Sequence, residues 1–178
     1  ASNNTAVGYT ALLSNTTGAN NTAVGSGSLS AHTTGNSNTA LGHNAAQDTT
    51  TGYNITAIGR ESLANNTTGY DNVAVGKGTL ITNTTGTRNT GLGTAALAAN
   101  TNASNNVAVG YAALLANTTG GQNVAVGKGS MALNTTGENN TSVGFNSLDS
   151  NTTGVENVVV GASALGVNTT GGYNVALG

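Results

Sequence analysis

Glycine recurs every 17 residues along the whole chain, from Gly8 to Gly178, without an insertion or a deletion. The residues around it repeat as well, with the consensus N-[TV]-A-V-G-x-x-[AS]-L-x-x-N-T-T-G-x-x. When Asn4 is taken as repeat position 1, ten full repeats occupy residues 4–173 and a partial repeat stands at either end. Such a period is typical of solenoids, in which each repeat forms one coil and packs only on its neighbours. We therefore interpret residues 1–178 as a single repeat array.

The array begins and ends within a repeat, and neither end shows the atypical capping repeat that solenoids usually carry. We therefore expect it to be an excerpt of a longer fibre.

The composition alone would suggest disorder, because Asn, Thr and Gly make up 86 of the 178 residues and only ten residues are charged. However, all ten charged residues and all six aromatic residues fall at repeat positions 6, 7, 10, 11, 16 and 17. A disordered chain has no reason to keep these residues in register. The partition indicates a fold whose constant positions form the interior and tight turns, while the variable positions face water.

The segment N-T-A-V-G alternates in the manner of a strand, with positions 2 and 4 on one side and positions 1 and 3 on the other. The A-L-x-x segment is predicted as a second, shorter strand. The alternative structure for this segment is one helical turn, which the alanine-rich sequences at Ala95–Ala99 and Ala112–Ala116 favour most. The chain contains no Asn-Gly or Asp-Gly hairpin signal, so like repeats are expected to stack in parallel. The predicted fold class is an all-β parallel β-solenoid (β-roll) with one 17-residue repeat per coil and about ten coils.

Positions 4 and 9 carry the sizeable aliphatic residues and are the predicted core. The predicted core residues are Val7, Val24, Leu41, Ile58, Val75, Leu92, Val109, Val126, Val143 and Val160 at position 4, and Leu12, Leu29, Leu63, Leu80, Leu97, Leu114, Leu148 and Leu165 at position 9. Glycines at positions 5 and 15 are predicted to form corners, often with positive φ, and the first of these are Gly8, Gly18, Gly25, Gly35, Gly42 and Gly52. Asparagine at positions 1 and 12 is predicted to form hydrogen-bonded ladders along the stack.

This core is thin, because two aliphatic side chains per coil contribute roughly 3–6 kcal/mol, less than the cost of ordering 17 residues. We therefore expect further burial between chains. One face of the first strand would fill the coil, and the other would meet neighbouring subunits.

Three segments, Asn21–Leu29 (NTAVGSGSL), Asn72–Leu80 (NVAVGKGTL) and Asn123–Met131 (NVAVGKGSM), resemble the repeat of trimeric autotransporter adhesin heads of the YadA type. The longer N-T-A-V-G-Y-x-A-L-x-x-N-T-T-G version is similar to repeats of trimeric phage tail fibres, and the resemblance covers the whole chain. It implies a left-handed parallel β-roll, a homotrimer with the position-4 residues inside, and an extracellular location on a cell surface or virion. The 17-residue coil, the leucine at position 9 and the N-T-T-G corner depart from the adhesin pattern.

No catalytic, cofactor-binding or metal-binding residue is predicted. There is no cysteine, no aspartate column for calcium, and no serine beside a base. The two histidines, His32 and His43, are interpreted as surface substitutions. Four Lys and Arg residues give no footprint for nucleic acid, and no apolar run predicts membrane contact.

The leading functional hypothesis is a structural segment of an extracellular fibre or adhesin, without catalysis. One alternative is an adhesive head that binds a glycan or host receptor through Tyr53, Tyr70, Tyr9 and Tyr111. A second alternative is ice binding by the threonine column at position 13. The N-T-T sequons, such as those at Asn66 and Asn117, also match glycosylation sites.

Overall fold

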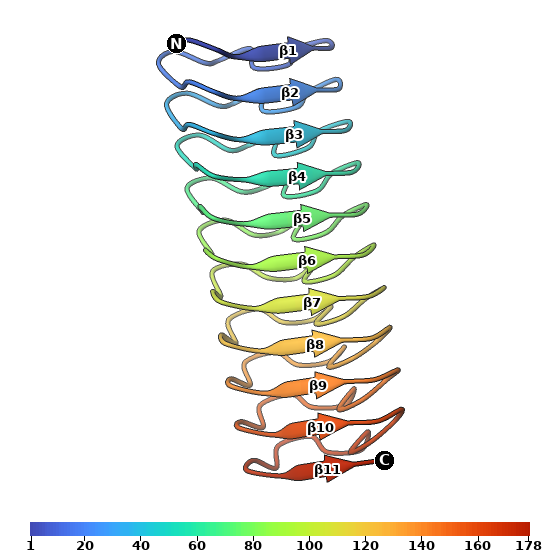
Figure 1. Cartoon of the computed structure of the whole chain (residues 1–178). Coiled ribbons are helices and arrows are strands. Elements are labelled where there is room, and N and C mark those ends of the chain that lie inside the picture. Colours follow the sequence, from blue (N-terminus) through green and yellow to red (C-terminus); the bar gives the residue numbers. More distant parts are fainter.

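The computed structural model describes residues 1–178. It is a stack of coils with one three-residue strand in each, and the strands pair in sequence order into one parallel sheet (Figure 1). The strands are β1 (Thr5–Val7), β2 (Thr22–Val24), β3 (Thr39–Leu41), β4 (Thr56–Ile58), β5 (Val73–Val75), β6 (Thr90–Leu92), β7 (Val107–Val109), β8 (Val124–Val126), β9 (Thr141–Val143), β10 (Val158–Val160) and β11 (Val175–Leu177). The predicted parallel β-solenoid with one repeat per coil is confirmed.

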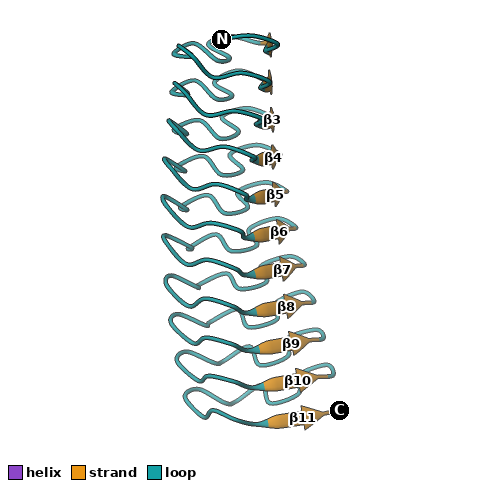
Figure 2. Ribbon diagram, turned by 60° about the vertical axis from the view of Figure 1, so that its left-hand side comes forward, coloured by secondary structure: helices purple, strands orange, loops and turns teal.

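Each strand pairs with residues 17 further along the chain, as in Thr5 with Thr22 and Val7 with Val24. In Figure 1 the chain crosses the near side through each strand, returns behind it and descends to the next coil, and Figure 2 agrees from a second side. This winding is left-handed. Ten strand spacings of about 4.8 Å give a rod about 48 Å long between β1 and β11.

The A-L-x-x segment is a series of turns, so the prediction of a second strand there is wrong, as is the alternative of a helical turn. Positions 7 and 9 adopt the left-handed conformation, for example at Glu61 (φ 58) and Leu63 (φ 51). Successive N–H groups then point in different directions. The Ser62 N–H donates to Gly59 within its own coil at 3.3 Å, whereas the Leu63 N–H donates to Thr79 of the next coil at 2.9 Å.

The core lies on the inner side of the sheet and is lined by positions 3, 8 and 9. The position-3 alanines from Ala23 to Ala125 are fully buried, and so is the position-9 residue of every coil between Leu29 and Leu148. Leu12 and Leu165, in the first and last full coils, are only partly buried. The leucines predicted as core therefore lie in it, and the small position-3 side chains let the two walls of the coil approach closely.

The position-4 residues face outward, so their assignment to the core is wrong within one chain. Their side chains are half-buried or exposed, with Leu41 47% exposed and Val160 42% exposed. The physical reason is the alternation of the strand, because the coil closes on the side of positions 1 and 3 and leaves positions 2 and 4 outside. The misassigned residues are Val7, Val24, Leu41, Ile58, Val75, Leu92, Val109, Val126, Val143 and Val160.

The two glycine positions serve different purposes. At position 5 the backbone has positive φ, as in Gly8 (φ 134) and Gly25 (φ 133). At position 15, which includes Gly18, Gly35 and Gly52, no positive φ occurs, so the conformational part of the prediction is wrong there. Glycine is required at position 15 for space, since a Cβ on Gly52 would lie 2.6 Å from the carbonyl oxygen of Gly69 in the next coil.

Candidate interaction surfaces

Two asparagines close most coils on one carbonyl group. In the coil that contains β5, the Nδ2 atoms of Asn72 (position 1) and Asn83 (position 12) both donate to the carbonyl oxygen of Gly86, at 2.8 and 3.1 Å. The Oδ1 atom of Asn72 accepts the backbone N–H of Asn89 in the next coil at 3.0 Å. The Nδ2 atom of Asn83 also reaches Asn66 Oδ1 of the preceding coil at 2.8 Å. The predicted ladders thus exist, and in the coils that carry both asparagines they also tie the two ends of the coil together.

His32 occupies position 12 in place of asparagine, and it is fully buried rather than a surface residue. Its Nε2 atom takes over one asparagine bond, to the Gly35 carbonyl at 2.8 Å. Its ring does not replace the ladder bond, since His32 Nδ1 and Asn15 Oδ1 are both buried without a hydrogen-bond partner. Burial lowers the pKa of His32 below its ordinary value of 6.5, against the opposing effect of the hydrogen bond to the Gly35 carbonyl and of the nearby Thr49 backbone. The second histidine, His43, is exposed.

The outer face of the sheet, formed by positions 2 and 4, presents a continuous row of aliphatic position-4 side chains along the rod. We call it the strand face. It presents Thr or Val at position 2 and Val, Leu or Ile at position 4 in each coil. Its side chains stay half-buried or exposed from β1 to β11. Contiguous apolar surfaces of this kind mark sites of protein association.

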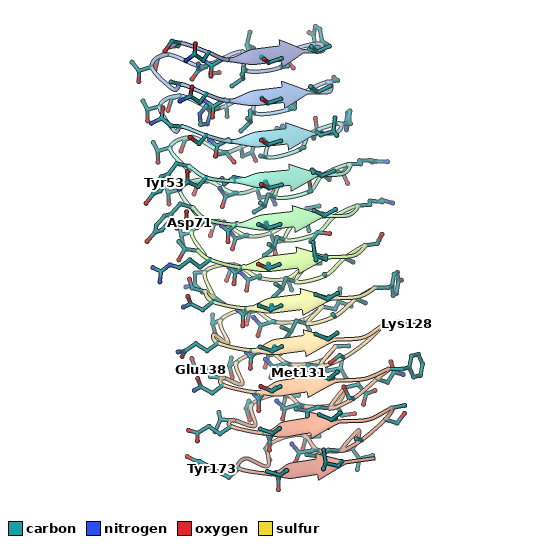
Figure 3. All side chains as sticks on the ribbon, in the orientation of Figure 1. Tyr53, Asp71, Lys128, Met131, Glu138 and Tyr173 are labelled. Atoms are coloured by element: carbon teal, nitrogen blue, oxygen red, sulfur yellow. The ribbon has the colours of Figure 1, made fainter.

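Two edges flank the strand face, and they differ in charge. The strand-end edge, at positions 6 and 7, carries three of the four cations, namely Arg60, Lys77 and Lys128. Its one acid, Glu61, is paired with Arg60 at 2.9 Å. The strand-start edge, at positions 16 and 17, carries three acids and one cation, which are Asp71, Glu138, Glu156 and Arg88. Figure 3 shows Asp71 and Glu138 on one side of the rod and Lys128 on the other. This segregation was readable in the repeat register but was not predicted.

Tyr53 and Tyr70 lie on the strand-start edge and stack on one another, with ring centroids 4.8 Å apart and planes 4° apart. Arg88 also lies over the Tyr70 ring, with its guanidinium carbon 5.9 Å from the ring centroid. Its Nη2 atom lies 3.3 Å from the Tyr70 hydroxyl. The Tyr70 ring therefore has neighbours along its stack and offers less free face to a sugar than the sequence suggested. Tyr9 and Tyr111 lie apart from this pair on the strand-end edge and are 81% and 59% exposed.

The threonine hydroxyls at position 13 are engaged in bonds between coils. Thr33 Oγ1, for example, donates to the carbonyl of Thr50 at 3.0 Å, and the same bond recurs along the column. The adjacent position 14, with threonine in nine of ten coils, is exposed. The asparagines of the sequons at Asn66 and Asn117 are fully buried, and their Nδ2 atoms donate to backbone carbonyls. Glycosylation of these two amides is therefore incompatible with the fold.

No pocket and no group of three or more potential metal ligands occurs in the structure. The structure also has no helix that is long and apolar enough to cross a membrane. The strand face and its two edges are the candidate interaction surfaces of the rod. Comparison with protein-family models, with curated proteins and with solved structures finds no match to this chain.

Proposed function

We propose that this chain is a rigid structural segment of an extracellular fibre or adhesin. The observation that carries the proposal is the unbroken ladder of eleven parallel strands, in which every coil repeats the same register. Each coil is tied to the next through the sheet, the asparagine ladders and the position-13 hydroxyls. Bending the rod would break bonds on several sides at once, which suits a spacer that must hold its length.

The proposed partner is another copy of the same chain, with a homotrimer as the expected assembly. The strand face supports this, because a stripe of aliphatic side chains runs along the whole rod and is covered by nothing in one chain. A second copy presents the same stripe at the same coil spacing, so contacts made at one coil recur at every other. The thin core of positions 3, 8 and 9 supports the same proposal, since burial of the strand face would add to the stability of each coil.

A duplication of residues 4–173 tests the structural role. These residues are ten whole repeats, so the duplicated array keeps the period across the join. The rod should lengthen by about 48 Å at constant cross-section, as measured by small-angle X-ray scattering. Two particles connected by a flexible joint would contradict a continuous rigid segment.

Surface labelling tests the location. Antibodies against this chain should label intact, unpermeabilised cells or particles of its source. Labelling that appears only after lysis would contradict an extracellular fibre.

A second candidate is an adhesive role through the exposed aromatic residues of the strand-end edge, Tyr9, Tyr111 and Phe145. They are 81%, 59% and 51% exposed, and aromatic rings that stand out from a rigid surface can stack on sugars. Glycan-array binding that is lost in the Tyr111→Ala variant would support this role. An array without binding would leave the purely structural role as the better account.

A further inference from the structure

The two edges of the strand face carry opposite charge, and this difference bears on how copies of the chain pack. The inference rests on the proposed self-association. Positions 16 and 17 lie three and two residues before the start of each strand, and position 6 lies two residues after its end, so both edges can be compared strand by strand. At β5, Asp71 lies before the strand and Lys77 lies after it.

No strand brings like charges to its two ends. At β4, Arg60 lies across from Tyr53 and Asn54, and at β6, Arg88 lies across from Thr94. At β8, Gln122 lies across from Lys128, and at β9, Glu138 lies across from Phe145. At β10, Glu156 lies across from Ala162. An edge of one copy can therefore meet the opposite edge of another at the same level without charge repulsion.

We propose that copies of this chain associate in parallel, with the strand-end edge of one copy against the strand-start edge of the next, and with Lys77 of one copy opposite Asp71 of its neighbour. Closed cyclic symmetry with the strand faces inward generates this contact, because rotation about an axis along the rods keeps equal strands level. An antiparallel pair would instead place each edge against its own copy. The cations at Arg60, Lys77 and Lys128 would then share one seam, which like charge opposes.

Cysteine cross-linking tests the pairing, because the native chain contains no cysteine. The double variant Asp71→Cys/Lys77→Cys should form disulfide-linked oligomers up to the size of the native assembly under mild oxidation with diamide. Each single variant should remain uncross-linked, since the two positions lie on opposite edges. A matched control is Asp48→Cys/Lys77→Cys, in which Asp48 lies at position 11, outside both edges, and it should not cross-link.

Charge exchange provides a second readout. Asp71→Lys and Lys77→Asp should each weaken association, by about fivefold per interface, and the double exchange should restore it. Sedimentation separates the possible failures. A monomeric wild-type chain would overturn the proposed self-association and this inference with it. A wild-type oligomer that does not cross-link in the double variant, or that cross-links equally in the single variants, would overturn the edge pairing alone.

Discussion

The Asn106→Ala substitution tests whether the asparagine at position 1 holds the coil closed. Asn106 is fully buried, and its Nδ2 atom donates to the Gly120 carbonyl at 3.0 Å and to Asn89 Oδ1 at 3.3 Å. Its Oδ1 atom accepts the backbone N–H of Asn123 at 3.0 Å. Alanine removes all three bonds, and it leaves the Asn123 N–H buried without this acceptor.

The expected loss of stability follows from this count. A hydrogen bond contributes about 1 kcal/mol net, and an orphaned buried donor costs about 1–3 kcal/mol. We therefore expect Asn106→Ala to lower the free energy of unfolding by about 3 kcal/mol. The matched control is Asn65→Ala, because Asn65 is exposed and its side chain makes no hydrogen bond, so its effect should stay within about 0.5 kcal/mol.

Urea denaturation followed by circular dichroism measures the loss, and amide hydrogen exchange locates it. Exchange should accelerate first at the Asn123 N–H and in the two coils that meet there. Repeat arrays can open locally, so the exchange result holds even where the unfolding is not two-state. If Asn106→Ala matched Asn65→Ala in both measurements, the closure role of position 1 would be refuted.

Three further substitutions test other parts of the account. Gly110 has φ 134, and a Cβ added there would lie 2.6 Å from the backbone of the next coil, so Gly110→Ala should lower the stability by about 2–6 kcal/mol in urea denaturation. The control Gly78→Ala, at φ 63 in open space, should cost about 1 kcal/mol. Equal losses in the two variants would contradict the steric reason. Gly91→Ala places its Cβ 2.5 Å from Thr79 Cγ2, so adding Thr79→Ala should recover part of the loss in a double-mutant cycle, and simple additivity would count against the contact. Because burial lowers the pKa of His32 below 6.5, protons bind the unfolded chain more tightly, and stability should fall as the pH drops through 6.5 toward the lower folded value. His32→Asn should raise the stability by about 1–2 kcal/mol and flatten this pH dependence in melts between pH 7 and 5; an unchanged slope would contradict it.

The repeat register was enough to predict the parallel solenoid, because a 17-residue period with no hairpin signal leaves little else for the chain to form. The inside and the outside of the strand were harder to assign. Size favoured Val75 and its equivalents as core, but the coil is so narrow that the small Ala74 points inward instead. Because the larger aliphatic residue of each strand lies on the outside of the coil, hydrophobicity alone assigns the two sides of the strand wrongly.

The turns were missed for a different reason. Leucine at position 9 rarely adopts positive φ, so nothing in the residue type of Leu63 signals its conformation. His32 was misplaced because a lone histidine in a repeat is usually a surface substitution. Comparison down the column with Asn66 and Asn83 would have identified it as a member of the buried asparagine ladder. The charge difference between the edges was visible at Lys77 and Asp71, but it acquired meaning only when the strands placed them at opposite ends.

Small-angle X-ray scattering of the wild-type chain tests whether this sequence forms a rigid rod that associates side by side with its own copies. One scattering curve reports mass, length and cross-section together. We expect a particle about 48 Å long between its terminal strands, with a mass near 52 kDa, three times the 17.2 kDa of one chain. A mass of 17.2 kDa would contradict the association, and the profile of a flexible coil would contradict the rod.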